Sequence, residues 1–371
     1  MSHANSKQHN KRLMKILIIN SKGHWINGWM TSPDSLHAVV DVLQKASCQV
    51  KVIEIATLTE LEQILSRTSS DTLVWANAYW VGGADGTLYN LPEQISKHNL
   101  PMLGSVTSTL TKLLDKGVCQ QLLKEAKVPT PHFIIISNED AIEEVPYSIQ
   151  HASLSFPLVI KPTNESRSQG VTKVDNKNQA VSTIAFLRQK FPESNIIIEE
   201  FLPNNDVTCG FMQLGNKMML LPSFNVVKGM DCSTEVLSEA HYQLPPSYEE
   251  QVLISDTKIL EQLQEHLPRI IESLHIQGVT RVDARLDKNG TLNFFDINGM
   301  PGLNYPISAL IKQCFVHFPA YSKEYLFQCL IHTIVLENFQ RYHLPSPATM
   351  QEHHLFKLES ETVISREASY Y

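Results

Sequence analysis

GVTRVDARLDKNGTLNFFDINGMPG (residues 278–302) decides the fold of this chain, because two alternating apolar segments flank an Asn289-Gly290 pair. Such a pair between two alternating segments is a strong signal for a β-hairpin with a two-residue loop. Counting outward from the loop pairs Asp287 with Leu292, Arg285 with Phe294, Asp283 with Asp296, and Arg281 with Asn298. The predicted register therefore places the carboxylates of Asp283 and Asp296 opposite each other.

Opposed carboxylates on neighbouring strands indicate a cation site. Directly opposed side chains have Cβ atoms about 4.5–5.5 Å apart, where like charges destabilise a sheet unless something neutralises them. Asn298 lies two residues beyond Asp296, and so on the same strand face. Its amide oxygen completes an all-oxygen set that suits Mg²⁺. The alternative is that one aspartate is solvated, or is paired with Arg281 or Arg285.

Two further segments end in polar groups that suit a nucleotide. FPLVIKP (156–162) is a hydrophobic strand that ends near Lys161, and the polar loop after it offers backbone N–H groups and Arg167 to anionic oxygens. IIIEEFL (196–202) ends in two acids, an aromatic residue and a leucine, a sequence suited to hydrogen bonding and stacking with a purine. Taken alone, each segment is also typical of an ordinary strand end or sheet edge.

Together and in this order, these stretches resemble the ATP-grasp ligases, and within them the D-alanine:D-alanine ligase branch. The resemblance covers about residues 72–310 and includes GGADGTLYNLPE (82–93) and LGSVTSTLTKLLDKGVCQQLLKEAKVPTP (103–131). It implies an α/β, three-domain ATP-grasp fold in which ATP is clasped between the central and C-terminal domains. The expected divisions are an N-terminal domain, a central domain, a C-terminal domain and a loosely ordered tail, at residues 1–104, 105–201, 202–345 and 346–371.

The resemblance also implies roles for particular residues. It assigns catalysis to Arg281, Lys161 and Ser168, with Arg281 stabilising the oxyanion of a tetrahedral intermediate. The nucleotide ligands that it implies are Lys116 and Lys161 for the phosphates, Glu165 to Gly170 as a loop over the triphosphate, Glu199, Glu200, Phe201 and Leu202 for adenine, and Asp206 for the ribose. The metal ligands that it implies are Asp283, Asp296 and Asn298, for two Mg²⁺ ions or Mn²⁺ in their place.

The implied reaction has two steps. A small-molecule carboxylate attacks the γ-phosphate of ATP to give an acyl phosphate and ADP, and an amine then displaces phosphate to form an amide. Phosphoryl transfer of this kind requires positioning and charge neutralisation, so no protein nucleophile is needed.

The chain departs from the family's pattern where the family binds its amino acids. Two features of the family are absent: there is no acid from Ser21 to Trp29, and there is no Lys-Tyr pair in residues 229–236. Four positions carry other residues: Tyr79-Trp80 replaces His-Gly, Ala84 replaces a glutamate, Ile307 replaces a serine with Ser308 beside it, and Asp296 replaces a glutamate. An aromatic cluster of Trp25, Trp29, Tyr79 and Trp80 either lines a larger pocket or packs in the core. We therefore expect substrates other than two D-alanines. A genuine D-alanine:D-alanine ligase, or a nucleotide-binding module without ligase activity, are the alternatives.

Composition excludes several other classes of protein. The 371 residues contain 31 Lys+Arg and 38 Asp+Glu, a net charge of −7 that disfavours a nucleic-acid partner. The longest apolar runs, such as Ile16 to Ile19, are far below the roughly 18 residues of a membrane span, so no membrane partner is expected. Six separated cysteines without a CxxC pair favour the cytoplasm. Residues 1–12 are expected to be a disordered leader, and the sequence does not decide between a monomer and a homodimer.

Hydrophobic periodicity predicts the remaining elements. The predicted strands are Lys15 to Asn20, Gln49 to Ile55, Thr72 to Ala76, Leu100 to Leu103, His132 to Ile136, Leu158 to Lys161, Ile196 to Glu200, Cys209 to Leu214 and Lys217 to Leu221. The predicted helices are Ser35 to Lys45, Thr107 to Val128, Glu249 to Leu274 and Lys323 to Phe339.

Overall fold

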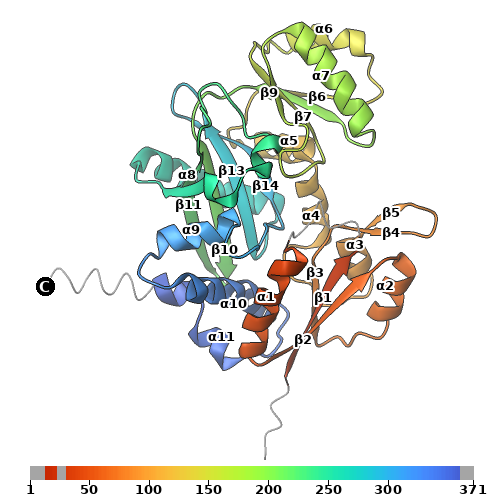
Figure 1. The fold of residues 1–371 in the computed structure, drawn as a ribbon, viewed down its shortest axis with the longest axis vertical. Helices are drawn as coiled ribbons and strands as arrows, with labels where there is room; N and C mark the ends of the chain where they lie inside the picture. Colours follow the sequence, from red (N-terminus) through yellow and green to blue (C-terminus); the bar gives the residue numbers. More distant parts are fainter. Residues whose placement is uncertain (1–12, 23–30, 360–371) are drawn as a thin grey trace, which may run out of the picture.

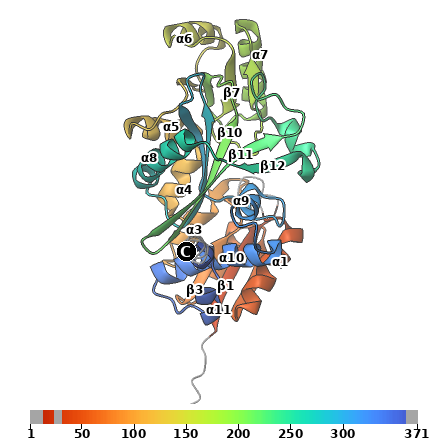
Figure 2. The same ribbon diagram turned by 90° about the vertical axis from the view of Figure 1, so that its left-hand side faces the viewer.

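The computed structural model describes residues 13–22 and 31–359 of the chain. These residues form an α/β fold, as predicted, built around three sheets that follow one another along the long axis of the molecule (Figures 1 and 2). A four-stranded sheet lies at one end, a five-stranded sheet in the middle and a three-stranded sheet at the other end. The predicted leader and the segment with Trp25 and Trp29 lie outside the described residues.

The three-stranded sheet is parallel, in the order β2-β1-β3. Its central strand buries the apolar run Ile16 to Ile19 completely, as expected for a strand covered on both faces. The predicted strand Leu100 to Leu103 is wrong: only Met102 bridges to Val74, because Pro101 has no N–H to donate to a ladder. The elements of this unit are β1 (Met14–Ser21), α1 (Pro33–Lys45), β2 (Cys48–Ile55), α2 (Leu58–Leu65), β3 (Thr72–Ala76), the hairpin β4 (Trp80–Gly82) and β5 (Leu88–Asn90), and α3 (Leu91–Ser96).

The predicted helix Thr107 to Val128 is two helices, α4 (Thr107–Leu114) and α5 (Lys116–Glu125). Asp115 separates them because its backbone is extended and its carboxylate accepts hydrogen bonds from the N–H groups of Gly117 and Val118. This break places Lys116 at the first turn of α5.

The four-stranded sheet has the order β6-β9-β7-β8 and is covered on one face by α6 and α7 (Figure 1). Its apolar side chains form a hydrophobic core of their own between Ile136 and Ile198. Its elements are β6 (Phe133–Ile136), a 3₁₀ turn (Ile142–Glu144), α6 (Val145–His151), β7 (Leu158–Pro162), β8 (Thr172–Val174), α7 (Lys177–Lys190) and β9 (Ile196–Glu200).

The five-stranded sheet is antiparallel, in the order β12-β11-β10-β13-β14. The predicted helix Glu249 to Leu274 is wrong at its start, because Glu249–Leu253 pairs with β11 as an edge strand and the helix begins only after the N-cap residue Asp256. The elements are β10 (Asp206–Leu214), β11 (Lys217–Val227), two 3₁₀ turns (Glu239–Gln243 and Pro246–Tyr248), β12 (Glu249–Leu253), α8 (Thr257–Leu274), β13 (Val279–Leu286), β14 (Leu292–Asn298) and α9 (Ala309–His317).

The hairpin β13–β14 confirms part of the predicted register. Asp283 faces Asp296 and Arg281 faces Asn298, as predicted, but Arg285 faces Asn293. The loop has three residues, since the N–H of Asp287 donates to the carbonyl of Thr291 and Gly290 takes the left-handed conformation (φ 80°). A β-bulge between Asp283 and Ala284 leaves Phe295 unpaired and compensates for the longer loop.

The end of the described chain returns to the N-terminal unit. Helix α10 (Lys323–Arg341) packs with α1 and α9, and α11 (Ala348–Glu352) follows it (Figure 1). Met350, Leu355, Phe356 and Leu358 are buried in the same hydrophobic core as β1 and β3. The predicted loosely ordered tail is therefore wrong for residues 346–359, while 360–371 lie outside the described residues. No helix in the described part of the chain is long and apolar enough to cross a bilayer.

Candidate active site

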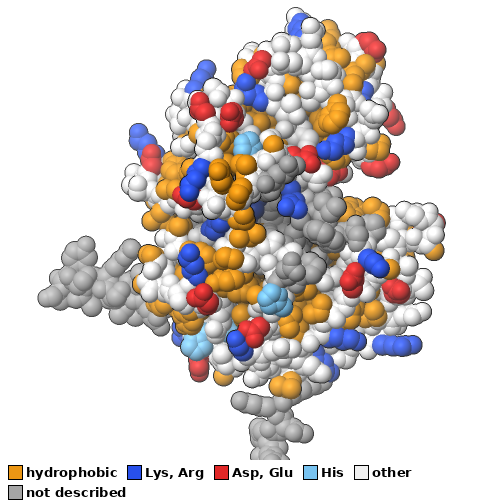
Figure 3. Space-filling view, viewed as in Figure 1, with side chains coloured by type: hydrophobic (Ala, Val, Ile, Leu, Met, Phe, Trp, Pro, Cys, Tyr) orange, Lys and Arg blue, Asp and Glu red, His pale blue; other side chains and the backbone are white. Residues whose placement is uncertain are grey.

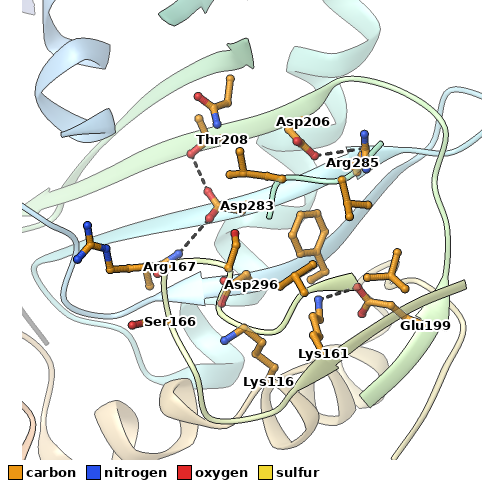
Figure 4. Close-up of a pocket in the computed structure, with 18 of the residues that line it drawn as sticks. Lys116, Lys161, Ser166, Arg167, Glu199, Asp206, Thr208, Asp283, Arg285 and Asp296 are labelled. Atoms are coloured by element: carbon orange, nitrogen blue, oxygen red, sulfur yellow. Dashed lines mark hydrogen bonds and ion pairs between the residues drawn. The ribbon is translucent and has the colours of Figure 1, made fainter. Parts of the chain in front are cut away.

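Most of the predicted site residues line one cleft between the four-stranded and five-stranded sheets (Figure 4). The cleft has a volume of about 1120 Å³, including space open to solvent. Of the predicted residues only Gly170 and Phe201 are not part of its lining. The residues that line it are Lys116, Lys161, Glu165, Ser168, Glu199, Glu200, Leu202, Asp206, Arg281, Asp283, Asp296 and Asn298.

The pairing of the strands places the polar side chains of β10, β13 and β14 on one face of the five-stranded sheet. Asp206 pairs with Arg285, Thr208 pairs with Asp283, and Asp283 pairs with Asp296 across three adjacent strands. Paired residues and residues two apart on a strand share a face, so these polar groups all point into the cleft. Gly210 continues β10 on the same face, where a Cβ atom would lie 2.5 Å from Leu310 of α9, so the helix can approach closely only because this residue is glycine.

The other wall of the cleft carries a buried ion pair. Nζ of Lys161 lies 2.6 Å from Oε1 of Glu199, and only 5% and 6% of the two side chains are exposed. The two residues are diagonal neighbours on β7 and β9. Nζ also lies 4.9 Å from the centre of the Phe295 ring, the residue extruded by the bulge. The positive charge of Lys161 is therefore held at a fixed place in the cleft.

Gln120 holds this wall against the five-stranded sheet, and sequence reasoning missed it. Its side-chain N–H groups donate to Oε2 of Glu199 (3.0 Å) and to the carbonyl oxygen of Phe295 (3.2 Å), and the residue is fully buried. One signal was available: Gln120 lies four residues after Lys116, on the same side of helix α5. The Nζ of Lys116 itself donates to the carbonyl oxygen of Glu165, at the start of the polar loop.

Asp283 is already surrounded by hydrogen-bond donors. Arg281 donates to both carboxylate oxygens (3.0 and 2.8 Å), Thr208 donates at 2.7 Å, and the Asn298 amide donates at 3.0 Å. The alternative in which Asp283 pairs with Arg281 is therefore what the structure describes. Thr208 was not predicted, although it lies two residues after Asp206 on the strand and thus on the same face.

Asp296 differs from Asp283, since its carboxylate forms no hydrogen bond or ion pair with any residue that the structure describes. Its negative charge, after burial itself, helps to raise the pKa of Tyr79 and of Cys119. A half-buried carboxylate without a partner, opposite a second carboxylate, is the chemistry that hard divalent cations select, so the residues present fit Mg²⁺. Within the described residues, however, no three His, Cys, Asp or Glu side chains lie together as a metal site.

Arg285 and Asp206 form a second ion pair deeper in the cleft, with Nε 3.3 Å from Oδ1. Burial raises the pKa of Asp206 to about 6, and this effect exceeds the lowering by Arg285. Arg285 also donates to the carbonyl oxygens of Cys232 and Glu235 and so anchors the segment that stands where the family's Lys-Tyr loop was expected. Val236 of this segment lines the cleft.

A second cavity adjoins the cleft and shares Lys116, Arg281, Asp296 and Asn298 with it. It has a volume of about 1210 Å³, including space open to solvent. The residues that line it on its far side include Tyr79, Leu113, Met300, Ile307 and Ser308. A molecule in this cavity would therefore reach the charged groups of the cleft.

Residues 122–319, more than half of the chain, match the family described as D-ala D-ala ligase C-terminus. The chain belongs to the D-alanine–D-alanine ligase family. It is 28% identical to a D-alanine–D-alanine ligase of Prochlorococcus marinus over 227 residues, which is 60% of this chain and 61% of that relative's length. It is 24% identical to D-alanine–D-alanine ligase B of Pseudomonas putida over 274 residues, 72% of this chain and 77% of the relative.

Solved structures of this family share the fold. The D-alanine–D-alanine ligase of Bacillus anthracis complexed with ATP superposes with a TM-score of 0.62 and 16% identity, covering 88% of this chain and 99% of that one. The VanG D-Ala:D-Ser ligase of Enterococcus faecalis superposes with a TM-score of 0.64 and 18% identity, covering 89% and 100%. The fold of the chain is thus the ATP-grasp fold expected from its motifs. The domain boundaries stay a prediction.

Some of the positions where the chain departs from the family pattern line the second cavity, and others do not. Tyr79 and Ile307 line the second cavity, so these two replacements change its wall. Ala84 lies at the exposed tip of the β4–β5 hairpin, outside the lining of the described cavities. The loss of a carboxylate at position 84 therefore says nothing about the described part of the pocket.

Proposed function

We propose that the protein is an ATP-dependent ligase that joins a carboxylate to an amine. The observation that carries the proposal is the shared boundary of the two cavities, which Lys116, Arg281 and Asp296 all line. A nucleotide in the cleft and a carboxylate in the second cavity would have their reacting ends at this boundary. Membership of the D-alanine–D-alanine ligase family supports the same reaction.

Different residues of the cleft suit the adenine, the ribose and the phosphates of ATP. Leu202 follows the end of β9, and its backbone N–H donates to no residue that the structure describes, which leaves it available to adenine. We propose Asp206 for the ribose, and Lys116 and Lys161 for the phosphates. The loop after β7 covers the phosphate end, and its residues Arg167 and Ser168 both take the left-handed conformation (φ 56° and 53°), which turns successive N–H groups toward one side.

In the proposed reaction the substrate carboxylate attacks the γ-phosphorus of ATP, and the bond to the β–γ bridging oxygen breaks to release ADP. The amine nitrogen then attacks the acyl carbon, the carbon–oxygen bond breaks, and phosphate leaves as the nitrogen loses a proton. Asp283, Asp296 and Asn298 would hold Mg²⁺, which supplies neutralising charge for the phosphoryl group. Asp283 holds the guanidinium of Arg281 at the boundary of the two cavities, where we propose that it stabilises the tetrahedral oxyanion.

We further propose that the substrates are not two D-alanines. Tyr79 and Ile307 give the second cavity a larger and less polar wall than the histidine and serine of the family pattern. The resemblance to the VanG D-Ala:D-Ser ligase indicates that this fold serves a protein with a different named substrate pair. A genuine D-alanine:D-alanine ligase and a nucleotide-binding module are the competing candidates.

Release of ADP and phosphate from ATP and Mg²⁺, measured with D-alanine alone and with a panel of other amino acids, carboxylates and amines, separates the three candidates. We expect turnover that depends on a substrate other than D-alanine and that Asp296→Asn removes. Efficient turnover with D-alanine alone, and no gain with any other compound, would return the protein to D-alanine:D-alanine ligation. Nucleotide binding without turnover across the panel would favour the binding module.

A further inference from the structure

A side pocket opens where the cleft and the second cavity meet. It has a volume of about 580 Å³, including space open to solvent, and shares Arg167 and Glu249 with both. Its walls combine apolar side chains with the charged residues Arg167, Glu249 and Lys312. Hydrophobic side chains gather along the middle of the face shown in Figure 3. The apolar residues of the wall are Val227, Leu237, Leu244, Pro245, Pro246, Tyr248 and Ile307.

Exposure of large apolar side chains at one place indicates a binding surface. Leu244, Tyr248 and Ile307 are 38%, 42% and 40% exposed, and all three line this pocket. Scattered exposed apolar residues are ordinary, whereas a concave group of them beside polar residues marks a ligand site. The side pocket is therefore suited to an apolar group of a molecule that also enters the cleft.

Glu249 is the acid that faces the junction of the three cavities. It begins β12, two residues before Gln251, and the two side chains lie on the same face of the strand. Gln251 is buried on that face and donates to Asn225, which lines the cleft. Glu249 itself pairs with Val227, which lines the side pocket. The register thus directs the Glu249 side chain toward the cavities.

The neighbouring acid behaves differently. Glu250 points to solvent on the opposite face and forms an ion pair with Lys228 at 2.7 Å. The Glu249 carboxylate forms no hydrogen bond or ion pair with any residue that the structure describes. Lys312, the cation beside it, donates hydrogen bonds to the backbone carbonyl oxygens of Pro246 and Glu249. Burial lowers the pKa of Lys312, and the negative charges of Glu249 and Glu250 oppose this effect. A carboxylate half-removed from water at such a place favours a cationic ligand.

We propose that Glu249 binds the nitrogen of the amine substrate and that the side pocket holds an apolar substituent of that substrate. The proposal rests on the proposed ligase function and narrows it to amines with a bulky apolar group.

Binding of small amine probes to the full chain tests this proposal without turnover. The probe is 2-phenylethylamine, compared by ligand-observed NMR titration with ethylamine, which lacks the ring, and with 2-phenylethanol, which lacks the charge. We expect the probe to bind at least about tenfold more tightly than either comparison compound, since one missing apolar group or charge partner in a fitted pocket changes affinity by that order.

Two matched pairs of variants assign the effect to the named residues. Glu249→Gln should abolish the advantage over 2-phenylethanol, while Glu250→Gln, one position along the strand, should keep it. Tyr248→Ala should abolish the advantage over ethylamine, while Tyr147→Ala, 70% exposed on α6, should keep it. Cooperative thermal unfolding of each variant establishes that it is folded.

Equal affinity for the probe and ethylamine, or the same preference in Glu249→Gln as in Glu250→Gln, would overturn the proposal. Release of ADP is measured on the same samples. Loss of turnover in every condition, with the amine preference intact, would reject the ligase function while leaving the Glu249 site in place.

Discussion

Replacing Lys161 with methionine removes one partner of a buried ion pair and keeps a side chain of similar length. The two charges are 2.6 Å apart, and the side chains are only 5% and 6% exposed, so solvent screens them little. Gln120 would still donate one hydrogen bond to Glu199, but it carries no charge. Removing one partner of such a pair costs about 3–5 kcal/mol, so we expect the free energy of unfolding to fall by about that amount in urea denaturation.

A surface pair of the same length is the control. Lys45 lies 2.6 Å from Asp41, but the side chains are 75% and 57% exposed, and Lys45→Met should cost no more than about 1 kcal/mol. The double variant Lys161→Met/Glu199→Gln removes both buried charges and should be less destabilised than the sum of its single variants. A Lys161→Met variant as stable as Lys45→Met, or strict additivity in the double variant, would refute the reasoning.

Three further predictions concern the cleft. Asp296→Asn should abolish Mg²⁺-dependent release of ADP yet change the free energy of unfolding by less than about 1 kcal/mol, because its carboxylate has no hydrogen-bond partner among the described residues. Asp283→Asn loses several hydrogen bonds and should cost about 1–3 kcal/mol, and equal unfolding midpoints for the two variants would contradict this. Burial raises the pKa of Asp206 from 3.8 to about 6, so ionisation of this carboxyl opposes folding. The wild type should therefore lose stability relative to Asp206→Asn as the pH rises from about 4 to about 6. A constant difference between their thermal unfolding temperatures across that window would exclude this effect. Gln120→Leu should cost about 1–3 kcal/mol and weaken ATP binding, and unaltered urea denaturation would show that the amide does not join the two walls.

The β13–β14 hairpin shows how far sequence reasoning reached. Alternation and the Asn-Gly pair predicted two facing strands, and the pairing of Asp283 with Asp296 is confirmed. The intervening register is wrong because the loop has one more residue than assumed, and the bulge at Phe295 compensates for it. The predicted pairs Asp283–Asp296 and Arg281–Asn298 are right because the extra loop residue and the bulge offset each other. A bulge has no unique sequence signal, so local pattern alone does not reveal it.

Contacts between distant segments were the harder part of the site to predict. The sequence placed Lys161 and Glu199 near strand ends, but their ion pair depends on the order β9-β7, which hydrophobic periodicity does not determine. Likewise, Arg281 supplies beside Asp283 the positive charge that was expected to come from a bound cation. The edge strand at Glu249 was predicted as helix, because a short strand with one buried side chain leaves little hydrophobic pattern in the sequence.

The separate hydrophobic core of the four-stranded sheet has a consequence for hydrogen exchange. Because β7 and β9 share no core residues with the five-stranded sheet, their amide protons can exchange through an opening that leaves the other cores intact. A ligand that contacts both Lys161 and Asp283 would bind only the closed arrangement. At a concentration of 100 times its Kd, such a ligand would add about 2.7 kcal/mol to the free energy of that opening. Slower exchange of the β7 and β9 amide protons would then report occupancy of the cleft.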